Sequence, residues 1–291
     1  MERLLRFDPE RLRRDYAACA FWFSHALHAS DLFALPRLAE LAEFLHAAHG
    51  SRDVYNAAAG LAPGERFAAN GGLGISPGQA VEAIATSGSW VVLRRVEQDP
   101  GFRVIVNACL AEVAAAVPAF RPPHIEKAEG FIFITSPKGV TPYHIDPQWS
   151  FLAQIHGCKS YRIYDSHDPS VVSEPEIENL LAGDFNAAVF APEKGAKSAV
   201  FALSPGDAIT QPVFAPHTAE VGDDYSVSFS LAIVSEEWSR ATAVRLANRW
   251  LRQAGFSPAP IGSNRALDAV KNVAWRAAAR IAYRQERRAV S

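Results

Sequence analysis

The sequence is poor in cysteine and has no long apolar run, and each absence excludes a class of protein. The 291 residues contain only three cysteines, Cys19, Cys109 and Cys158, which lie far apart and form no Cys-x-x-Cys pair. This argues against a disulfide-stapled domain or a zinc finger and predicts a protein of the reducing cytoplasm. No segment reaches the roughly 20 apolar residues of a membrane-spanning helix. The stretch MERLLRFDPERLRRDY is charged throughout, so no secretory signal is expected.

Net charge is also small, but it is unevenly distributed. The formal net charge is −2, which argues weakly against a dedicated nucleic-acid binder. Residues 240–291 nevertheless hold eleven basic and two acidic residues, so they carry +9 and residues 1–239 carry −11. Like charges four residues apart on a helix repel one another, so this basic tail is expected to meet acidic groups. We expect these acidic groups to belong to residues 1–239 or to a second copy of the chain, and a nucleic acid is the alternative partner for the tail. Four arginines of this tail follow one another at four-residue spacing and form a stripe on one face of the predicted helix, namely Arg276, Arg280, Arg284 and Arg288.

Hydrophobic periodicity predicts helices in the first and last parts of the chain. Residues 1 to about 50 place apolar side chains at three- and four-residue spacing and are predicted to be helical. Capping and stop residues predict further helices at 76–88 and 99–117, with a buried strand at 89–96 between them. From Glu236 onward two amphipathic helices are expected, joined by the segment FSPAPIG.

The middle of the chain has the pattern of a β protein. From about residue 129, seven short β-branched or aromatic runs alternate with turn residues, which predicts an antiparallel sandwich or barrel. One helix, EPEIENLLAGD, interrupts these runs. We therefore predict a helical or mixed region at 1–127 that packs on the core, a β core at 128–237 and a pair of basic helices at 238–291.

Two histidines and an aspartate in this β region are candidate metal ligands. His144 and Asp146 are two residues apart, which places both side chains on one face of a strand. His217 follows a later strand and a turn bracketed by prolines. Two imidazoles and one carboxylate form the facial set that binds non-haem Fe(II) and leaves coordination positions open. By itself, His-x-Asp is more often a turn histidine beside a capping aspartate.

Lys159 is the second unusual residue of the β region. It is one of only six lysines among 29 basic residues, and it opens a strand on which Tyr161 and Ile163 share its face. A lysine that points into a barrel is costly unless it meets an anion, such as a dicarboxylic co-substrate. The alternative is a lysine at the strand edge whose ammonium extends to solvent.

The segment GFIFITSPKGVTPYHIDPQWSFLAQIHGCKSYRIYD resembles the core of the JmjC-type, cupin-fold oxygenases that use Fe(II) and 2-oxoglutarate. It is most similar to the branch of the asparaginyl hydroxylase that acts on hypoxia-inducible factor. Thr141 stands three residues before the first ligand histidine and Lys159 fifteen residues after it, as in that branch. LSPGDAITQPVFAPH resembles the segment that carries the branch's last ligand, here His217. The resemblance spans roughly residues 128–235 and implies a double-stranded β-helix, or jelly roll, with helical additions.

The resemblance also implies roles for these residues. His144, Asp146 and His217 would bind Fe(II) as the catalytic centre, and Lys159 with Thr141 would bind the far carboxylate of 2-oxoglutarate, with O₂ as co-substrate. It implies a hydroxylase that acts on a protein side chain or on a small amino-acid-like molecule. It further implies a homodimer formed through the C-terminal helices.

Two positions depart from the pattern of that branch. Ser150 and Ser230 stand where the branch has asparagines beside the co-substrate, so the pocket would be larger and would lack two amide donors. Ser226, Ser228 and Ser230 alternate with apolar residues and predict a small polar face along the pocket. Two other functions stay open at this point. One is a cupin-like ligand-binding or regulatory protein, and the other is a metal-dependent cupin enzyme that does not use 2-oxoglutarate.

Overall fold

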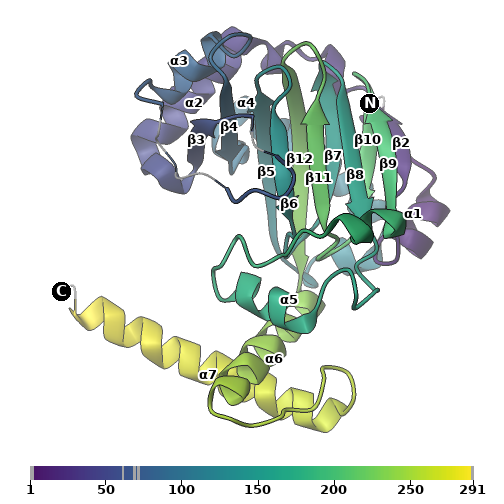
Figure 1. Cartoon of the computed structure of the whole chain (residues 1–291), viewed down its shortest axis with the longest axis vertical. Coiled ribbons are helices and arrows are strands. Elements are labelled where there is room, and N and C mark those ends of the chain that lie inside the picture. Colours follow the sequence, from purple (N-terminus) through teal and green to yellow (C-terminus); the bar gives the residue numbers. More distant parts are fainter. Residues whose placement is uncertain (1–2, 61, 68–69, 71–72, 290–291) are drawn as a thin grey trace.

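Eight antiparallel strands form a double-stranded β-helix, or jelly roll, in the computed structural model (Figure 1), which describes residues 3–60, 62–67, 70 and 73–289. β5, β7, β10 and β12 lie in one sheet, in the order β10-β7-β12-β5, and β6, β11, β8 and β9 form the facing sheet in that order. The β runs predicted an antiparallel sandwich or barrel and the family resemblance implied a jelly roll, and both predictions are confirmed. The strands are β5 (Ile125–Thr135), β6 (Val140–His144), β7 (Trp149–His156), β8 (Lys159–Tyr164), β9 (Ser198–Leu203), β10 (Asp207–Gln211), β11 (His217–Val221) and β12 (Ser226–Ser235).

The first third of the chain widens the larger sheet and covers its outer face. The sheet gains a strand pair at each edge, which gives the order β1-β2-β10-β7-β12-β5-β4-β3. The added strands are β1 (Leu5–Arg6), β2 (Trp22–His25), β3 (Val54–Ala58) and β4 (Ser89–Arg94). The helices of this region are α1 (Pro9–Asp15), α2 (Leu35–His49), α3 (Pro77–Glu82) and α4 (Pro100–Ala116).

The prediction that residues 1 to about 50 are helical is wrong for Trp22–His25. The first helix ends at Asp15, and residues 22–25 form β2, which pairs with β10. Phe21 and Phe23 are buried whereas Trp22 is exposed, which is the two-residue alternation of a strand. β10 would otherwise present an unpaired edge, and pairing with β2 satisfies its backbone groups. Pairing between strands that are distant in the sequence therefore prevails over the local helical pattern.

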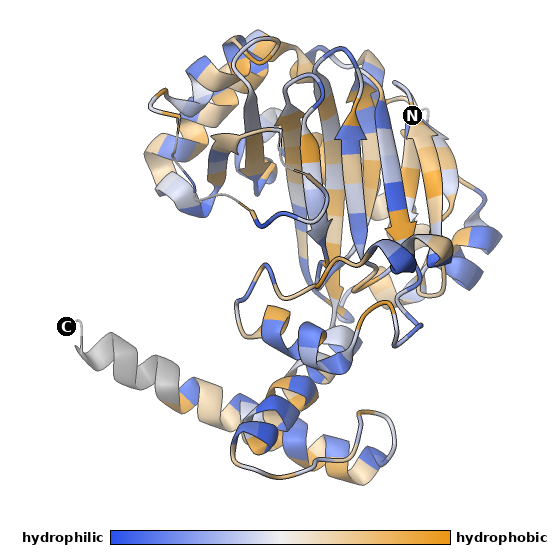
Figure 2. Ribbon diagram, viewed as in Figure 1, coloured by the Kyte–Doolittle hydropathy of each residue, from blue (hydrophilic) through white to orange (hydrophobic). Residues whose placement is uncertain are grey.

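The two faces of the larger sheet have different environments. Phe151, Phe229 and Trp149 are fully buried on the outer face in the main hydrophobic core, which they share with Leu41 of α2 and Phe102 of α4. The opposite face looks toward the smaller sheet and carries more polar side chains. Figure 2 shows polar and apolar bands alternating along these strands. The interior between the sheets therefore combines buried polar side chains with a smaller apolar cluster that includes Leu152, Ile163 and Ile209.

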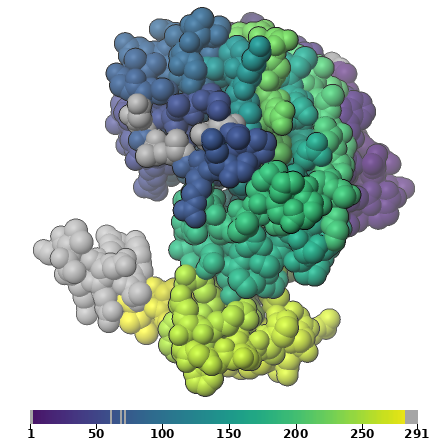
Figure 3. All heavy atoms as spheres, viewed as in Figure 1, coloured from purple at the N-terminus to yellow at the C-terminus, as the bar shows by residue number. Residues whose placement is uncertain are grey.

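The C-terminal helices form a lobe beside the β core (Figure 3). α6 (Glu236–Gln253) continues directly from β12, and α7 (Arg265–Ala289) packs against it and extends away from the body (Figure 1). Within the residues described, no helix is both long and apolar enough to span a bilayer. The side chains of Arg284 and Arg288, two members of the predicted arginine stripe, lie outside the described residues, whereas Arg276 contacts Glu126 at 3.3 Å.

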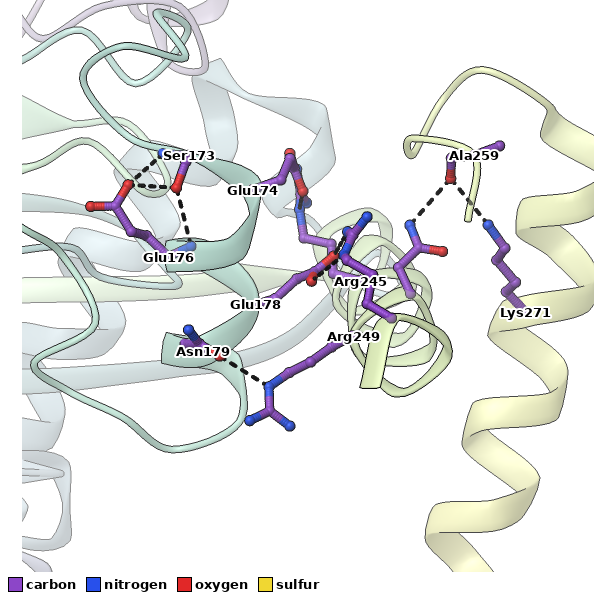
Figure 4. A network of polar contacts seen from close by, with 11 residues as sticks. Ser173, Glu174, Glu176, Glu178, Asn179, Arg245, Arg249, Ala259 and Lys271 are labelled. Carbon is purple, nitrogen blue, oxygen red and sulfur yellow. Dashed lines mark hydrogen bonds and ion pairs between the residues drawn. The ribbon is translucent and has the colours of Figure 1, made fainter. Parts of the chain in front are cut away.

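The basic side chains of α6 meet acidic groups of the short helix α5 (Glu174–Leu181), as Figure 4 shows. Arg245 makes a two-pronged contact with Glu174 at 3.0 Å, and Arg252 pairs with Glu178. Arg249 donates to the Asn179 side chain at 3.1 Å. Part of the positive charge of the tail is therefore neutralised by the acidic body.

We expect the replacement of Arg252 with methionine to destabilise the protein by about 3 kcal/mol, because it leaves a buried carboxylate without its cation. Glu178 is only 2% exposed. The matched control is the replacement of Arg249 with methionine, which removes a contact to a neutral amide and should cost less than about 1 kcal/mol. Urea unfolding of the two variants measures the difference, and equal losses would contradict this account.

Candidate metal centre

Two strands of the smaller sheet bring the three predicted ligands together. β6 ends at His144 and β11 begins at His217, and the two residues are direct partners in the ladder. Asp146 lies two residues beyond the end of β6, and its carbonyl accepts a hydrogen bond from the Phe214 backbone at 2.9 Å. Phe214 adopts a positive φ of 59°, which turns the chain back toward His217. The ligand atoms of His144, Asp146 and His217 lie within 4.8 Å of one another.

Backbone carbonyls orient both imidazoles toward a common point. Nδ1–H of His144 donates to the Pro142 carbonyl at 2.8 Å, and Nδ1–H of His217 donates to the Ala215 carbonyl at 3.1 Å. A carbonyl can only accept, so Nδ1 of each ring carries a proton and Nε2 is the nitrogen left to face a metal. The Asp146 carboxylate oxygen Oδ2 lies 4.0 Å from Nε2 of His144 and 3.7 Å from that of His217. These distances leave space for an ion between the three atoms.

The site is buried on one side and open on the other. The His217 side chain is 6% exposed, whereas that of Asp146 is 43% exposed, so solvent and ligands approach from the side of the aspartate. Burial and the neighbouring imidazole of His144 lower the pKa of His217 well below its usual value. A neutral imidazole is the form that binds a metal.

Gln211 and Tyr161 support the candidate ligands from within the barrel, and no sequence motif pointed to Gln211. Its amide nitrogen donates to Oδ2 of Asp146 at 3.3 Å, and its amide oxygen accepts from the Tyr161 hydroxyl at 2.5 Å. The Tyr161 ring also stacks on His217 with centroids 5.4 Å apart. Such contacts fix the direction of the metal ligands, which is the usual task of outer residues at a metal site.

Phe67 is a second residue that the sequence did not reveal. Its ring meets His144 edge-on at 5.0 Å and stacks on Trp90 at 5.4 Å. The Phe67 backbone is held in place by a hydrogen bond to the Asn186 side chain at 2.9 Å. No local signal could have found Phe67, because it reaches the site from a loop more than seventy positions away.

Lys159 lies deeper in the barrel than the metal ligands. It pairs with Val221, four residues along β11 from His217, which corresponds to about 13 Å of strand. It is 5% exposed, and burial lowers its pKa to about 8. Its ammonium donates to the Ser228 hydroxyl at 2.8 Å, and no carboxylate among the described residues forms an ion pair with it. Lys159 therefore points into the barrel and does not extend to solvent.

The other residues predicted for the co-substrate lie around the same space. Thr141 is opposite Ala219, which is also opposite Tyr161, so it falls between the level of the histidines and that of Lys159. Ser150 and Ser230 are 8% and 6% exposed on neighbouring strands of the larger sheet. In the register, Ser150 is directly opposite Gln211.

Three further polar or aromatic side chains near these segments in the sequence lie away from the ligands. His156 pairs with Asp224 at 3.0 Å and stacks on Tyr225. The Tyr143 hydroxyl donates to the Val171 carbonyl at 3.1 Å, away from the ligands. Trp149 is part of the outer core.

The donor set fits a divalent transition metal such as Fe(II). It consists of two imidazole nitrogens and one carboxylate oxygen, without thiolate, gathered on one side of the space between them. A closed structural zinc site would need a fourth protein ligand, and within the described part of the chain no fourth histidine, cysteine or carboxylate joins this cluster. The arrangement can hold an ion and still leave positions for small-molecule ligands.

The fold and these ligands define a jelly-roll protein with a candidate mononuclear metal centre. No known family model matches the chain, and no curated protein matches it. The chain is similar in fold to the X-ray structure of Escherichia coli ycfD, with 14% identity, a TM-score of 0.52 and coverage of 95% of this chain and 68% of that one. Structures of YcfD, a ribosomal oxygenase from Escherichia coli, with cobalt and 2-oxoglutarate or with cobalt and succinic acid give 14% identity, TM-scores of 0.51 and coverage of 94% and 67%.

Proposed function

We propose that the protein is an Fe(II)- and 2-oxoglutarate-dependent oxygenase of the JmjC type, most simply a hydroxylase. The observation that carries the proposal is the combination of the metal ligands with a lysine deeper in the same barrel that has no carboxylate partner among the described residues. A buried ammonium without such a partner is costly, and an anionic ligand would offset that cost. A dicarboxylic 2-oxo acid suits both positions, because one end can bind a metal and the other can meet Lys159.

The fold comparison supports this proposal. YcfD structures with similar folds contain cobalt together with 2-oxoglutarate or succinic acid. Cobalt is a divalent transition metal with the same preference for imidazole and carboxylate as Fe(II). The ligand set of the present chain is of that kind.

Each residue of the site would have a separate role. His144, Asp146 and His217 hold the ion, and Gln211 keeps the carboxylate directed at it. Lys159 and the Thr141 hydroxyl bind the far carboxylate of 2-oxoglutarate, while the buried walls exclude water. When bound, Fe(II) supplies the oxidative chemistry with O₂ and the 2-oxo acid, and the protein positions the reactants.

The substrate class is a further part of the proposal. We propose a protein side chain or a small amino-acid-like molecule, as the resemblance to the branch of the asparaginyl hydroxylase implies. Ser150 and Ser230 lack the amide groups of that branch, so a substrate of different size would fit. The cytoplasm remains the expected location from the cysteine usage alone.

Purified protein tests the proposal directly. With Fe(II) and ascorbate it should bind 2-oxoglutarate and form succinate slowly without added substrate. Iron-loaded protein that binds no 2-oxoglutarate would refute the proposal. Iron binding with turnover of another compound would instead favour a metal-dependent cupin enzyme without this co-substrate.

We also propose that two copies associate through the C-terminal helices. Val270, Val273 and Ile281 of α7 are 64%, 67% and 58% exposed, whereas Lys271 on the side facing α6 is 7% exposed. An outward apolar stripe on a protruding helix suits a second copy of the chain, because burying it removes apolar area from water.

Replacing Val270 and Val273 with aspartate is expected to convert a dimer into a monomer, because two charges would enter the apolar contact. Light scattering coupled to gel filtration measures the mass. The double replacement of Ala278 and Ala279 with aspartate adds the same charge at two exposed positions outside this stripe and serves as the control. A wild-type protein that is monomeric at high concentration would contradict the prediction.

A further inference from the structure

A chain of buried polar groups continues from Lys159 away from the metal ligands. The ammonium donates to the Ser228 hydroxyl at 2.8 Å, and that hydroxyl donates to the Gln154 amide oxygen at 2.8 Å. Gln154 and Ser228 are both 0% exposed. A fully buried hydroxyl and amide are costly unless they are hydrogen-bonded, so the chain is a specific feature of this interior.

The Gln154 amide can adopt only one orientation. Its nitrogen donates to the carbonyls of His156 at 2.7 Å and Gly157 at 3.1 Å, and contacts the Ser226 hydroxyl at 2.9 Å. Carbonyl oxygens only accept, so the amide nitrogen must face them and the amide oxygen must face Ser228. The direction of every hydrogen bond back to the lysine follows from this.

The backbone at this point is itself fixed by close packing. Gly157 has a positive φ of 69°, and a Cβ there would lie 2.0 Å from the Tyr225 carbonyl oxygen. The ladder between β7 and β12 shifts register between Val227 and Ser228, which brings Ser228 opposite Gln154. A tight turn and a β-bulge thus set the two carbonyls that hold the amide.

The consequence concerns the charge and direction of Lys159. Because the Ser228 proton points to Gln154, a lone pair of Ser228 is left for the ammonium. One of the three lysine N–H groups is used in this bond and two remain for a ligand. Ser228 and Gln154 are both neutral, so they direct the Lys159 ammonium without supplying a negative charge to pair with it.

We infer that Gln154, acting through Ser228, is a positioning residue that directs the Lys159 ammonium toward the far carboxylate of the co-substrate. It thereby increases the affinity of the protein for 2-oxoglutarate. The inference rests on the proposed function. It assigns selectivity for a dicarboxylic over a monocarboxylic 2-oxo acid to this buried chain as well as to the lysine.

The test compares two 2-oxo acids on Mn(II)-loaded full-length protein by calorimetry. 2-Oxoglutarate has the far carboxylate, and 2-oxovalerate has the same carbon chain with a methyl group in its place. Replacing Gln154 with methionine should raise the Kd of 2-oxoglutarate about tenfold, since the hydrogen bond that orients the Ser228 hydroxyl toward the lysine is lost, and leave the Kd of 2-oxovalerate within about twofold. Manganese affinity should not change. Gln253→Met, at the exposed end of α6, is the matched control.

Ser228→Ala is the second variant and should show the same selective loss if the methionine variant does not fold. An unchanged Kd for 2-oxoglutarate in the folded variant, or equal losses for both acids, would overturn the inference. Wild-type protein that binds manganese but not 2-oxoglutarate would instead overturn the proposed function, so the two failures are distinguishable.

Discussion

Replacing His144 or His217 with alanine should lower metal affinity by more than about a hundredfold and abolish succinate formation. Loss of a residue that only supports a ligand commonly costs about 10- to 100-fold, so loss of a ligand itself should cost more. Neither remaining ligand can move to compensate, because β6 and β11 are paired in one sheet and the imidazole of each is held by a backbone carbonyl.

Metal titration of the folded variants measures this effect. His46→Ala, on the exposed side of α2, is the matched control and should bind metal as the wild type does. Thermal unfolding shows whether the variants keep their structure. Folded variants of both histidines with unchanged metal affinity would exclude the proposed centre.

Replacing Lys159 with methionine should weaken 2-oxoglutarate binding about a hundredfold and leave metal binding intact. The lysine is buried and its only polar partner in the described structure is the Ser228 hydroxyl, so the far carboxylate would lose its single cation. A charge-assisted hydrogen bond in a buried site is worth about 1.5–3 kcal/mol, which corresponds to this change. Calorimetry on Mn(II)-loaded protein measures it.

The same variant should be more stable than the wild type without ligand. An unpaired buried ammonium destabilises the folded state, and methionine has a similar length without the charge. Lys138→Met is the control, because its side chain is 79% exposed and should change the free energy of unfolding little. A Lys159→Met variant that is less stable than the wild type and binds 2-oxoglutarate normally would contradict both expectations.

The pH dependence follows from the lowered pKa of Lys159. Burial lowers this pKa from 10.5 to about 8, so between these values the unfolded chain binds more protons than the folded one. The stability of the free protein should therefore rise across that range. The affinity for 2-oxoglutarate should fall above about pH 8, because the ligand needs the charged lysine. Both trends should disappear in the methionine variant.

Much of the candidate site could be proposed from the sequence, because most of its residues lie in one segment. Strand periodicity placed His144 and Asp146 on one face and made Lys159 unusual, whereas the role of Thr141 came from the family resemblance. The short β-branched and aromatic segments from residue 129 onward likewise predicted a β core. Alternating segments of this kind, separated by turn residues, are typical of an antiparallel sandwich or barrel.

Only the tertiary structure decided how distant segments complete the site. Gln211 reaches Asp146, Phe67 covers His144, and Gln154 orients Ser228 because sheet pairing brings separate strands and loops together. The strand at Trp22–His25 has the same origin, since an open edge of β10 prevailed over a local helical pattern. Local periodicity determined which secondary structure each segment favours. Strand pairing and burial, which act between residues far apart in the chain, determined which structure each segment adopts and which residues it contacts.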